Sequence, residues 1–219
     1  MTAPAVLIMA KVPIPGLVKT RLAATEGPVR AAQLATAALL DTLEVCAQVF
    51  DPDRRHIALG GQLEALEGTE LAEQLRSWRV HPQQGAGLAA RIANAHREMH
   101  LTSTGPVVQI GMDTPHVSAA TLRSVGRMVT AGDPVLGFAD DGGWWVLATS
   151  VASQVDGLER VPMSTPGTGR DTWELLRRGG PVGIAPTMRD VDDAGDAEHV
   201  ASLAPSTRFA RTWRARADL

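Results

Sequence analysis

Short apolar runs, most of them closed by glycine, proline or aspartate, alternate along this chain with longer segments of helical periodicity. Runs this short are typical of buried strands, and helices between them indicate a mostly parallel sheet covered on both faces. The expected fold is therefore a three-layer α/β/α domain. The expected strands are 5–10, 56–59, 77–81, 105–111, 134–139, 144–148 and 182–185, and the expected helices are 28–46, 63–75, 88–99, 119–129, 171–178 and 193–203.

No repeat, low-complexity tract or long linker divides the 219 residues. We therefore expect one domain over residues 1–204, followed at 205–219 by a basic tail whose arginines form a solvated or packing helix. Cys46 is the only cysteine, which excludes an intramolecular disulfide, and its apolar helical surroundings predict a buried thiol.

The overall charge indicates small-molecule partners. A formal net charge of −3 gives no general attraction to nucleic acid or to an anionic membrane, so any affinity for phosphate must be local. The chain has no apolar stretch long enough to span a bilayer and no secretory leader, so the cytoplasm is the expected compartment. The oligomeric state is not indicated by the sequence.

The loop after the first strand carries three cations, Lys11, Lys19 and Arg21, on a backbone that contains two prolines and Gly16. Ligands of open α/β sheets lie beyond the carboxyl ends of the strands, and Arg and Lys both suit phosphate oxygens. The loop is therefore predicted to bind a di- or triphosphate, the alternative being a solvated basic turn. The spacing of a Walker loop is absent.

Acidic residues follow two other expected strands. Asp113 comes just after the strand 105–111, where a single carboxylate suits Mg²⁺. The alternative is that Asp113 caps the helix that follows, but Ser118 is better placed for that role. Asp190 and Asp192 alternate on an extended segment, so both could reach a metal ion, while Asp193 could cap the last helix. The alternative for this late segment is a solvated acidic loop.

Two acids, two glycines and two tryptophans join the strands 134–139 and 144–148, in the order Asp140-Asp141-Gly142-Gly143-Trp144-Trp145. The glycines allow a ligand to approach the backbone, and one indole of the pair is expected to face the ligand crevice. Asp-Gly is also the commonest hairpin signal, so a plain hairpin is the alternative. His116 and His199 are expected to be surface or capping residues, and no general base is identified.

These segments together resemble a bacterial family known as selenodomain-associated transferases or as glycosyltransferases of the nucleotide-diphospho-sugar transferase (GT-A) superfamily. The family's opening motif matches residues 10–22, its Gly-x-Asp-x-Pro motif matches Gly111 to Pro115, and its late Asp-Val-Asp matches Asp190 to Asp192. Its Ala-Asp-Asp-Gly-Gly motif matches residues 139–145, with Trp where Tyr is usual. Two departures are His116, where the family often has an acid, and the lack of an acid before Leu88.

The resemblance implies a GT-A fold with a nucleotide over the first loop, a divalent ion, Mg²⁺ or Mn²⁺, and a small-molecule acceptor beyond it. More distantly, the first loop is similar to that of 2-phospho-lactate guanylyltransferase and of the molybdenum-cofactor guanylyltransferases. The residues implied for the nucleotide are Ala10, Lys11, Gly16, Lys19, Thr20 and Arg21; for the metal, Asp113, Asp190 and Asp192; for the acceptor, Asp140, Asp141, Gly142, Gly143 and Trp144.

Three functions fit these features. Nucleotidyl transfer from an NTP to a small anionic acceptor is slightly favoured, with Lys19, Arg21 and Asp113 as catalytic residues, because three cations suit a leaving pyrophosphate. Glycosyl transfer from an NDP-sugar is the alternative. The third is a nucleotide-binding protein without catalytic turnover.

Overall fold

One seven-stranded sheet organises the molecule, in the order β3-β2-β1-β4-β6-β5-β7, and a computed structural model describes it for residues 2–215. Only β6 runs against its neighbours, so the sheet is mostly parallel as predicted. The strands are β1 Ala5–Lys11, β2 Arg55–Gly60, β3 Arg79–Pro82, β4 Val107–Ile110, β5 Val135–Ala139, β6 Trp144–Thr149 and β7 Gly183–Met188.

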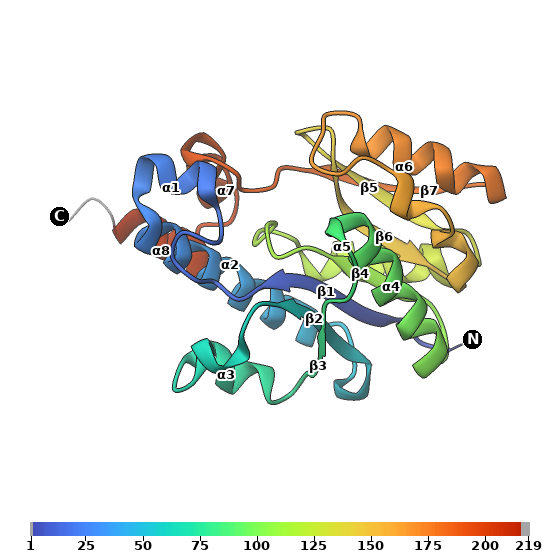
Figure 1. Cartoon of the computed structure of the whole chain (residues 1–219), viewed down its shortest axis with the longest axis horizontal. Coiled ribbons are helices and arrows are strands. Elements are labelled where there is room, and N and C mark those ends of the chain that lie inside the picture. The colour runs from blue at the N-terminus through green and yellow to red at the C-terminus, as the bar shows by residue number, and fades with distance from the viewer. Residues whose placement is uncertain (1, 216–219) are drawn as a thin grey trace.

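Helices cover both faces of this sheet and make three layers (Figure 1). The α-helices are α1 Thr20–Glu26, α2 Pro28–Ala47, α3 Glu70–Leu75, α4 Gly87–Thr102, α5 Ala119–Thr130, α6 Thr168–Leu176, α7 Ala194–Leu203 and α8 Arg208–Arg214. The three-layer α/β/α prediction is thereby confirmed. None of the helices described is long and apolar enough to cross a membrane.

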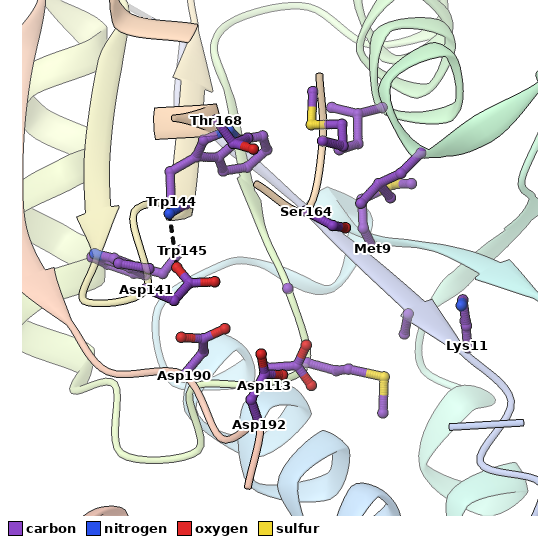
Figure 2. A pocket seen from close by; sticks show the side chains of 18 of the residues that line it. Met9, Lys11, Asp113, Asp141, Trp144, Trp145, Ser164, Thr168, Asp190 and Asp192 are labelled. Carbon is purple, nitrogen blue, oxygen red and sulfur yellow. Dashed lines mark hydrogen bonds between the residues drawn. The ribbon is translucent and has the colours of Figure 1, made fainter. Parts of the chain in front are cut away.

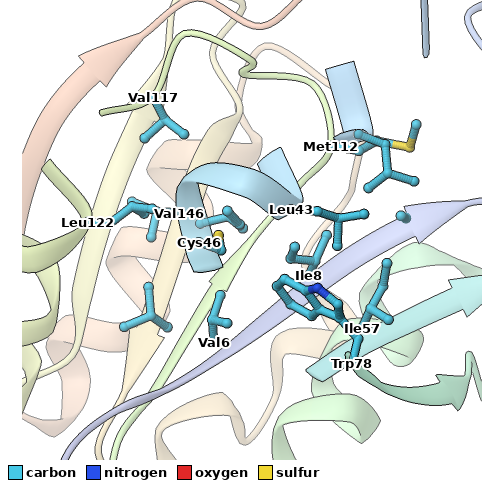
Figure 3. Packing of buried hydrophobic residues seen from close by; sticks show 14 of the residues in the cluster. Val6, Ile8, Leu43, Cys46, Ile57, Trp78, Met112, Val117, Leu122 and Val146 are labelled. Carbon is cyan, nitrogen blue, oxygen red and sulfur yellow. The ribbon is translucent and has the colours of Figure 1, made fainter. Parts of the chain in front are cut away.

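Side-chain alternation along β1 explains the layers. Val6 and Ile8 point into a core shared with α2, α3 and α5, whereas Leu7 points into a second core shared with α4 and α6. Figure 3 shows the first core, where Cys46 packs among aliphatic side chains. The thiol of Cys46 is fully buried, as predicted, and burial raises its pKa.

The ends of four parallel strands meet at one edge of the sheet. β1, β4, β5 and β7 all finish there, and the reversed strand β6 begins there. The connections that carry the sequence motifs leave this edge: the β1–α1 loop, the segment after β4, the β5–β6 turn and the β7–α7 segment. The four motifs of the sequence therefore lie together although they are far apart along the chain.

A third, smaller core joins the two ends of the chain. Figure 1 shows α1, α7 and α8 gathered beside α2. Leu22 of α1, Val191 before α7, and Phe209 and Trp213 of α8 are all buried in this core. The expected basic tail thus contains a helix that packs on the domain, with Asp41 of α2 accepting hydrogen bonds from the backbone N–H groups at its start. Residues 216–219 of that expected tail lie outside the described residues.

Two local predictions differ from the structure. The expected helix 63–75 is interrupted: a short 3₁₀ turn at Leu63–Leu66 is separated from α3 by Gly68, which has φ of 74°. The first loop is shorter than expected, because α1 begins at Thr20 within the motif. The predicted caps are confirmed, since Ser118 accepts a hydrogen bond from Thr121 N and Asp193 accepts one from Asp196 N.

Candidate active site

A cleft of about 790 Å³ opens at the sheet edge where β1, β4, β5 and β7 end. It brings together most of the residues that the sequence singles out, and leaves Gly16, Asp140 and Gly142 outside its lining. The predicted residues that line it are Ala10, Lys11, Lys19, Thr20, Arg21, Asp113, Asp141, Gly143, Trp144, Asp190 and Asp192.

Three carboxylates converge in this cleft (Figure 2). Asp141 comes from the β5–β6 turn, and Asp190 and Asp192 come from the segment after β7; one oxygen of each lies within 4.8 Å of the other two. Burial, together with the like charges of Asp141 and Asp192, raises the pKa of Asp190 to about 6. Such mutual repulsion shows a concentration of negative charge that a bound cation would relieve.

Asp113 lies beside these acids, but its carboxylate pairs with a lysine. Lys19 Nζ is 2.5 Å from Asp113 Oδ1 and 3.9 Å from Asp192 Oδ1, and it donates to the carbonyl oxygen of Val191. The Lys19 side chain is only 9% exposed. The structure therefore groups Asp141 with Asp190 and Asp192, where the sequence analysis expected Asp113.

The other two cations of the first loop remain accessible. Arg21 is 70% exposed and uses Nη1 to bind Asp192 Oδ2 at 2.7 Å, so its remaining donors are free to reach a ligand. Lys11 is exposed at the end of β1, and its side chain forms no hydrogen bond or ion pair with any residue in 2–215. The cleft also contains Arg91 of α4, which the sequence analysis did not single out.

The β5–β6 connection is a tight hairpin turn that also contributes to the cleft. Asp141 Oδ1 accepts a hydrogen bond from Gly143 N at 2.7 Å, and Gly142 has φ of 88°. Gly169 of α6 donates its N–H to Gly142 O at 2.8 Å, which ties the turn to the first turn of α6. Asp140 points away and binds Arg189, with Arg189 Nε 3.1 Å from Asp140 Oδ2, so only Asp141 of the acidic pair enters the cleft.

The segment between β6 and α6 forms a cleft side that the sequence analysis missed. Met163, Ser164, Thr165, Pro166 and Thr168 line it. Ser164 has a left-handed backbone with φ of 59°, which is unfavourable for a residue with a side chain. The hydroxyl groups of Thr165 and Thr168 form local hydrogen bonds, whereas the Ser164 hydroxyl forms none with the residues described. The available signal was a run of Ser, Thr, Pro and Gly that is typical of an ordered loop.

The two tryptophans differ in their surroundings. Trp145 is buried in the first core, donates to Pro186 O at 2.8 Å and also lines the cleft. Trp144 is half-buried, donates to Thr172 Oγ1 and lies beside Thr168 (Figure 2). His199 is exposed, as expected, while His116 is half-buried with its pKa lowered by burial; neither lines the cleft.

The fold is that of the nucleotide-diphospho-sugar transferases. A protein assigned to that class from Desulfovibrio desulfuricans G20 superposes with a TM-score of 0.80 at 24% identity, covering 98% of this chain and 94% of its own. Rv0371c from Mycobacterium tuberculosis H37Rv, in complex with manganese, has a TM-score of 0.52 at 21% identity, covering 91% and 98%. A cytidylyltransferase from Leptospira borgpetersenii has a TM-score of 0.61 at 12% identity, covering 98% and 94%.

The chain belongs to a bacterial protein family, DUF2064, described as uncharacterized proteins conserved in bacteria, which it matches over residues 39–165. The first loop and the late acids Asp190 and Asp192 lie outside that match. No curated protein matches the chain in sequence. The finer resemblance to selenodomain-associated transferases and to guanylyltransferases stays a prediction.

Proposed function

We propose that this protein is a metal-dependent transferase that uses a nucleotide, and that it moves a nucleoside monophosphate from an NTP to a small acceptor with release of pyrophosphate. One observation carries the proposal: three carboxylates within 4.8 Å of one another share a cleft with the cations of the first loop. Proteins of the same fold support it, since one is a manganese complex and another is a cytidylyltransferase.

The acidic cluster fits a divalent ion. Asp141, Asp190 and Asp192 offer hard oxygen donors from two different loops, and burial together with the like charges of its neighbours raises the pKa of Asp190. Mg²⁺ and Mn²⁺ prefer such donors and supply Lewis-acid stabilisation of phosphoryl oxygens when bound. We therefore assign Asp141, Asp190 and Asp192 as the metal ligands. Asp113 is not assigned as a ligand, because its carboxylate pairs with Lys19.

The residues of the chain then take distinct roles. Lys11 and Arg21 have free donors on the loop side of the cleft and are placed to hold the phosphates of the nucleotide. Stabilising the charge of the leaving group accounts for most of the catalysis in phosphoryl transfer. An acceptor whose reacting group is already an anion needs no general base, which agrees with the lack of a histidine among the described residues that line the cleft.

One observation favours glycosyl transfer as the second candidate. Among the described residues, the cations that line the cleft are Lys11, Lys19, Arg21 and Arg91, and they come from the end of β1, the start of α1, the loop between them, or α4. The opposite side, around Trp144 and Ser164, contributes an indole and hydroxyl groups but no cation. Such a side suits an uncharged, hydroxyl-bearing ring, which could be the sugar of an NDP-sugar or the body of an acceptor that meets the metal through its own anionic group.

A thermal-unfolding screen separates these candidates. NTPs and NDP-sugars are added separately, each with and without Mn²⁺ or Mg²⁺, because a ligand that binds only the folded state raises the melting temperature. We expect a metal-dependent rise with at least one NTP, and loss of that rise in Asp190→Asn. A rise confined to NDP-sugars would establish glycosyl transfer, and no rise with either group would exclude a nucleotide substrate.

A further inference from the structure

A buried amide interrupts an apolar row of side chains in the sheet. Gln109 of β4 lies in register with Leu7 of β1 and Leu147 of β6, and Leu147 is paired in turn with Leu136 of β5. The three leucines belong to the second core, whereas Gln109 is polar and only 2% exposed. Burying an amide lowers stability unless it is hydrogen-bonded, so an apolar residue would serve the fold better at this position.

The protein leaves most of this amide unused. The Gln109 side chain forms no hydrogen bond of ordinary geometry with any residue in 2–215, and its Oε1 is buried. Its polar neighbour is His96 of α4: burial lowers the pKa of that ring to about 3, and the Gln109 amide partly opposes this shift. His96 Nδ1 is 2.9 Å from Thr149 Oγ1, so only Nε2 of the neutral ring could serve Gln109. Because an amide has two donor hydrogens and two acceptor sites, most of its hydrogen-bonding capacity remains available.

Gln109 borders the cleft, and the cleft is open two residues further along the chain. Gln109 and Gly111 both line it, and a Cβ atom at Gly111 would meet nothing closer than Asp113 N at 3.9 Å. Met9 and Ile92, two buried residues of the second core, line it as well. The cleft thus reaches into the second core, where an apolar group can pack and can place a polar substituent on the amide.

A second polar group without a protein partner faces the cleft from the segment between β6 and α6. Ser164 has a left-handed backbone, with φ of 59°, and such strain persists where the surroundings enforce it. The Thr168 hydroxyl fixes both flanks of Ser164, because it accepts from Thr165 N at 3.1 Å and donates to Pro162 O at 2.8 Å. The Ser164 hydroxyl itself forms no hydrogen bond within residues 2–215, and Ser164 lines the cleft together with Trp144 (Figure 2).

These groups match a ring that carries hydroxyl groups. Gln109 and Ser164 each offer donors and acceptors, as a hydroxyl group does, and Met9 and Trp144 offer apolar surface for the C–H face of a ring. We propose that Gln109 and Ser164 are specificity-determining residues that bind the hydroxyl-bearing ring of the acceptor. This inference rests on the proposed function, because the ring is assigned to the substrate that reacts with the nucleotide.

Binding of matched phosphates, measured by calorimetry with and without Mn²⁺ and in the absence of nucleotide, tests the ring directly. The probes with hydroxyl-bearing rings are glucose 1-phosphate, mannose 1-phosphate, galactose 1-phosphate and myo-inositol 1-phosphate. Cyclohexyl phosphate has a ring and the same charge but no hydroxyl group, so it leaves the amide unpaired. At least one of the four is expected to bind about tenfold more tightly than cyclohexyl phosphate. If none does, the proposal is wrong.

Three variants locate the ring in the cleft. Gln109→Leu should weaken the tightest probe about tenfold, and Ser164→Ala about fivefold, since each removes hydrogen bonds to it. Gly111→Ala adds a methyl group to open space in the cleft and should weaken the probe as well. The control is Ser77→Ala, which removes a hydroxyl bonded to Gln74 O outside the cleft and should leave the dissociation constant unchanged.

Thermal unfolding without ligand separates this role of Gln109 from a structural one. Gln109→Leu should keep or raise the melting temperature, because it removes a buried polar group that the fold does not pair. A fall of more than about 4 °C, or failure to fold, would show that the amide supports the core and would overturn its assignment.

Failure of this inference is distinguishable from failure of the proposed function. A wild-type protein that binds NTPs but does not prefer hydroxyl-bearing rings would lose the ring site and keep the proposed function. A protein that binds such a ring through Gln109 and Ser164, but neither NTPs nor NDP-sugars, would keep the ring site and lose the proposed function.

Discussion

The two sides of the cleft differ in charge and in the way their backbones are held. The side formed by the end of β1, the β1–α1 loop, the start of α1 and α4 carries all the cations that line the cleft among residues 2–215. The side between β6 and α6 has none; instead, Gly142 and Gly169 hold its backbone segments in close contact. The acidic cluster lies between them. This difference indicates that phosphates bind on the first side and that the uncharged part of the second substrate binds on the other.

The largest expected effect comes from the glycines of the two sides. Gly142 and Gly16 both have positive φ, at 88° and 80°. A Cβ at Gly142 would lie 2.2 Å from the carbonyl oxygen of Pro166, whereas a Cβ at Gly16 would meet nothing within 4 Å. Gly142→Ala should therefore lower the free energy of unfolding by about 3 kcal/mol, and Gly16→Ala by about 1 kcal/mol, since only the first adds a backbone clash to the strain. Denaturant unfolding measures both; equal losses would contradict the close packing of the β5–β6 turn against Pro166.

Removing a carboxylate from between the two sides should weaken metal binding. Asp190→Asn is expected to lower Mn²⁺ affinity about 30-fold, equivalent to about 2 kcal/mol, because it removes a charged oxygen donor. Asp140→Asn is the matched control, since Asp140 pairs with Arg189 outside the cleft. Calorimetric titration measures both variants; a comparable loss in Asp140→Asn would show that general charge, not the cluster, attracts the metal.

The acidic cluster should also make metal binding depend on pH. The pKa of Asp190 is raised to about 6 by burial and by its acidic neighbours, so this group holds a proton to a higher pH than an ordinary aspartate. A divalent ion must displace that proton, so Mn²⁺ affinity should be level above about pH 7 and fall up to tenfold per pH unit below about pH 6. The slope should largely disappear in Asp190→Asn. A wild-type affinity that is constant down to about pH 5 would remove Asp190 from the ligand set.

The smallest expected effect separates the two sides directly. Lys11→Ala should weaken NTP binding about fivefold, or about 1 kcal/mol, because it removes an accessible cation on the phosphate side. Ser164→Ala, on the uncharged side, should leave the NTP dissociation constant unchanged. Calorimetry with a non-hydrolysable NTP and Mn²⁺ measures both constants. If Ser164→Ala weakened NTP binding as much as Lys11→Ala, the division of the cleft would be wrong.

Local patterns in the sequence predicted much of the fold. The buried strand β4 and helix α5 were predicted to within two residues at each end, because glycines bound the strand and Ser118 caps the helix. Asp190 and Asp192, which alternate along an extended segment, lie in one cluster. These features depend on neighbours in sequence, which a linear pattern records.

Features that depend on distant contacts were not predictable in this way. Nothing near Lys19 indicates that its ammonium binds Asp113 and Val191, and the motif at 139–145 could not show which of Asp140 and Asp141 enters the cleft. The basic composition of the last segment gave no sign that Phe209 and Trp213 are buried. Both side chains pack in one core with residues of α2 and α7. The uncharged side of the cleft was missed because its hydroxyl-rich loop has no charged motif to mark it.

The small core that joins α1, α7 and α8 has a consequence for biosynthesis. Lys19 donates to the carbonyl oxygen of Val191, which lies 172 residues further along the chain, and Leu22 shares its core with Val191 and Phe209. Domains fold largely as units during synthesis, and contacts this distant in sequence form late. The candidate active site is therefore completed only once the segment from Asp190 to α8 has been made and has packed, so a chain that stops before this segment would carry the basic loop without Asp190 and Asp192.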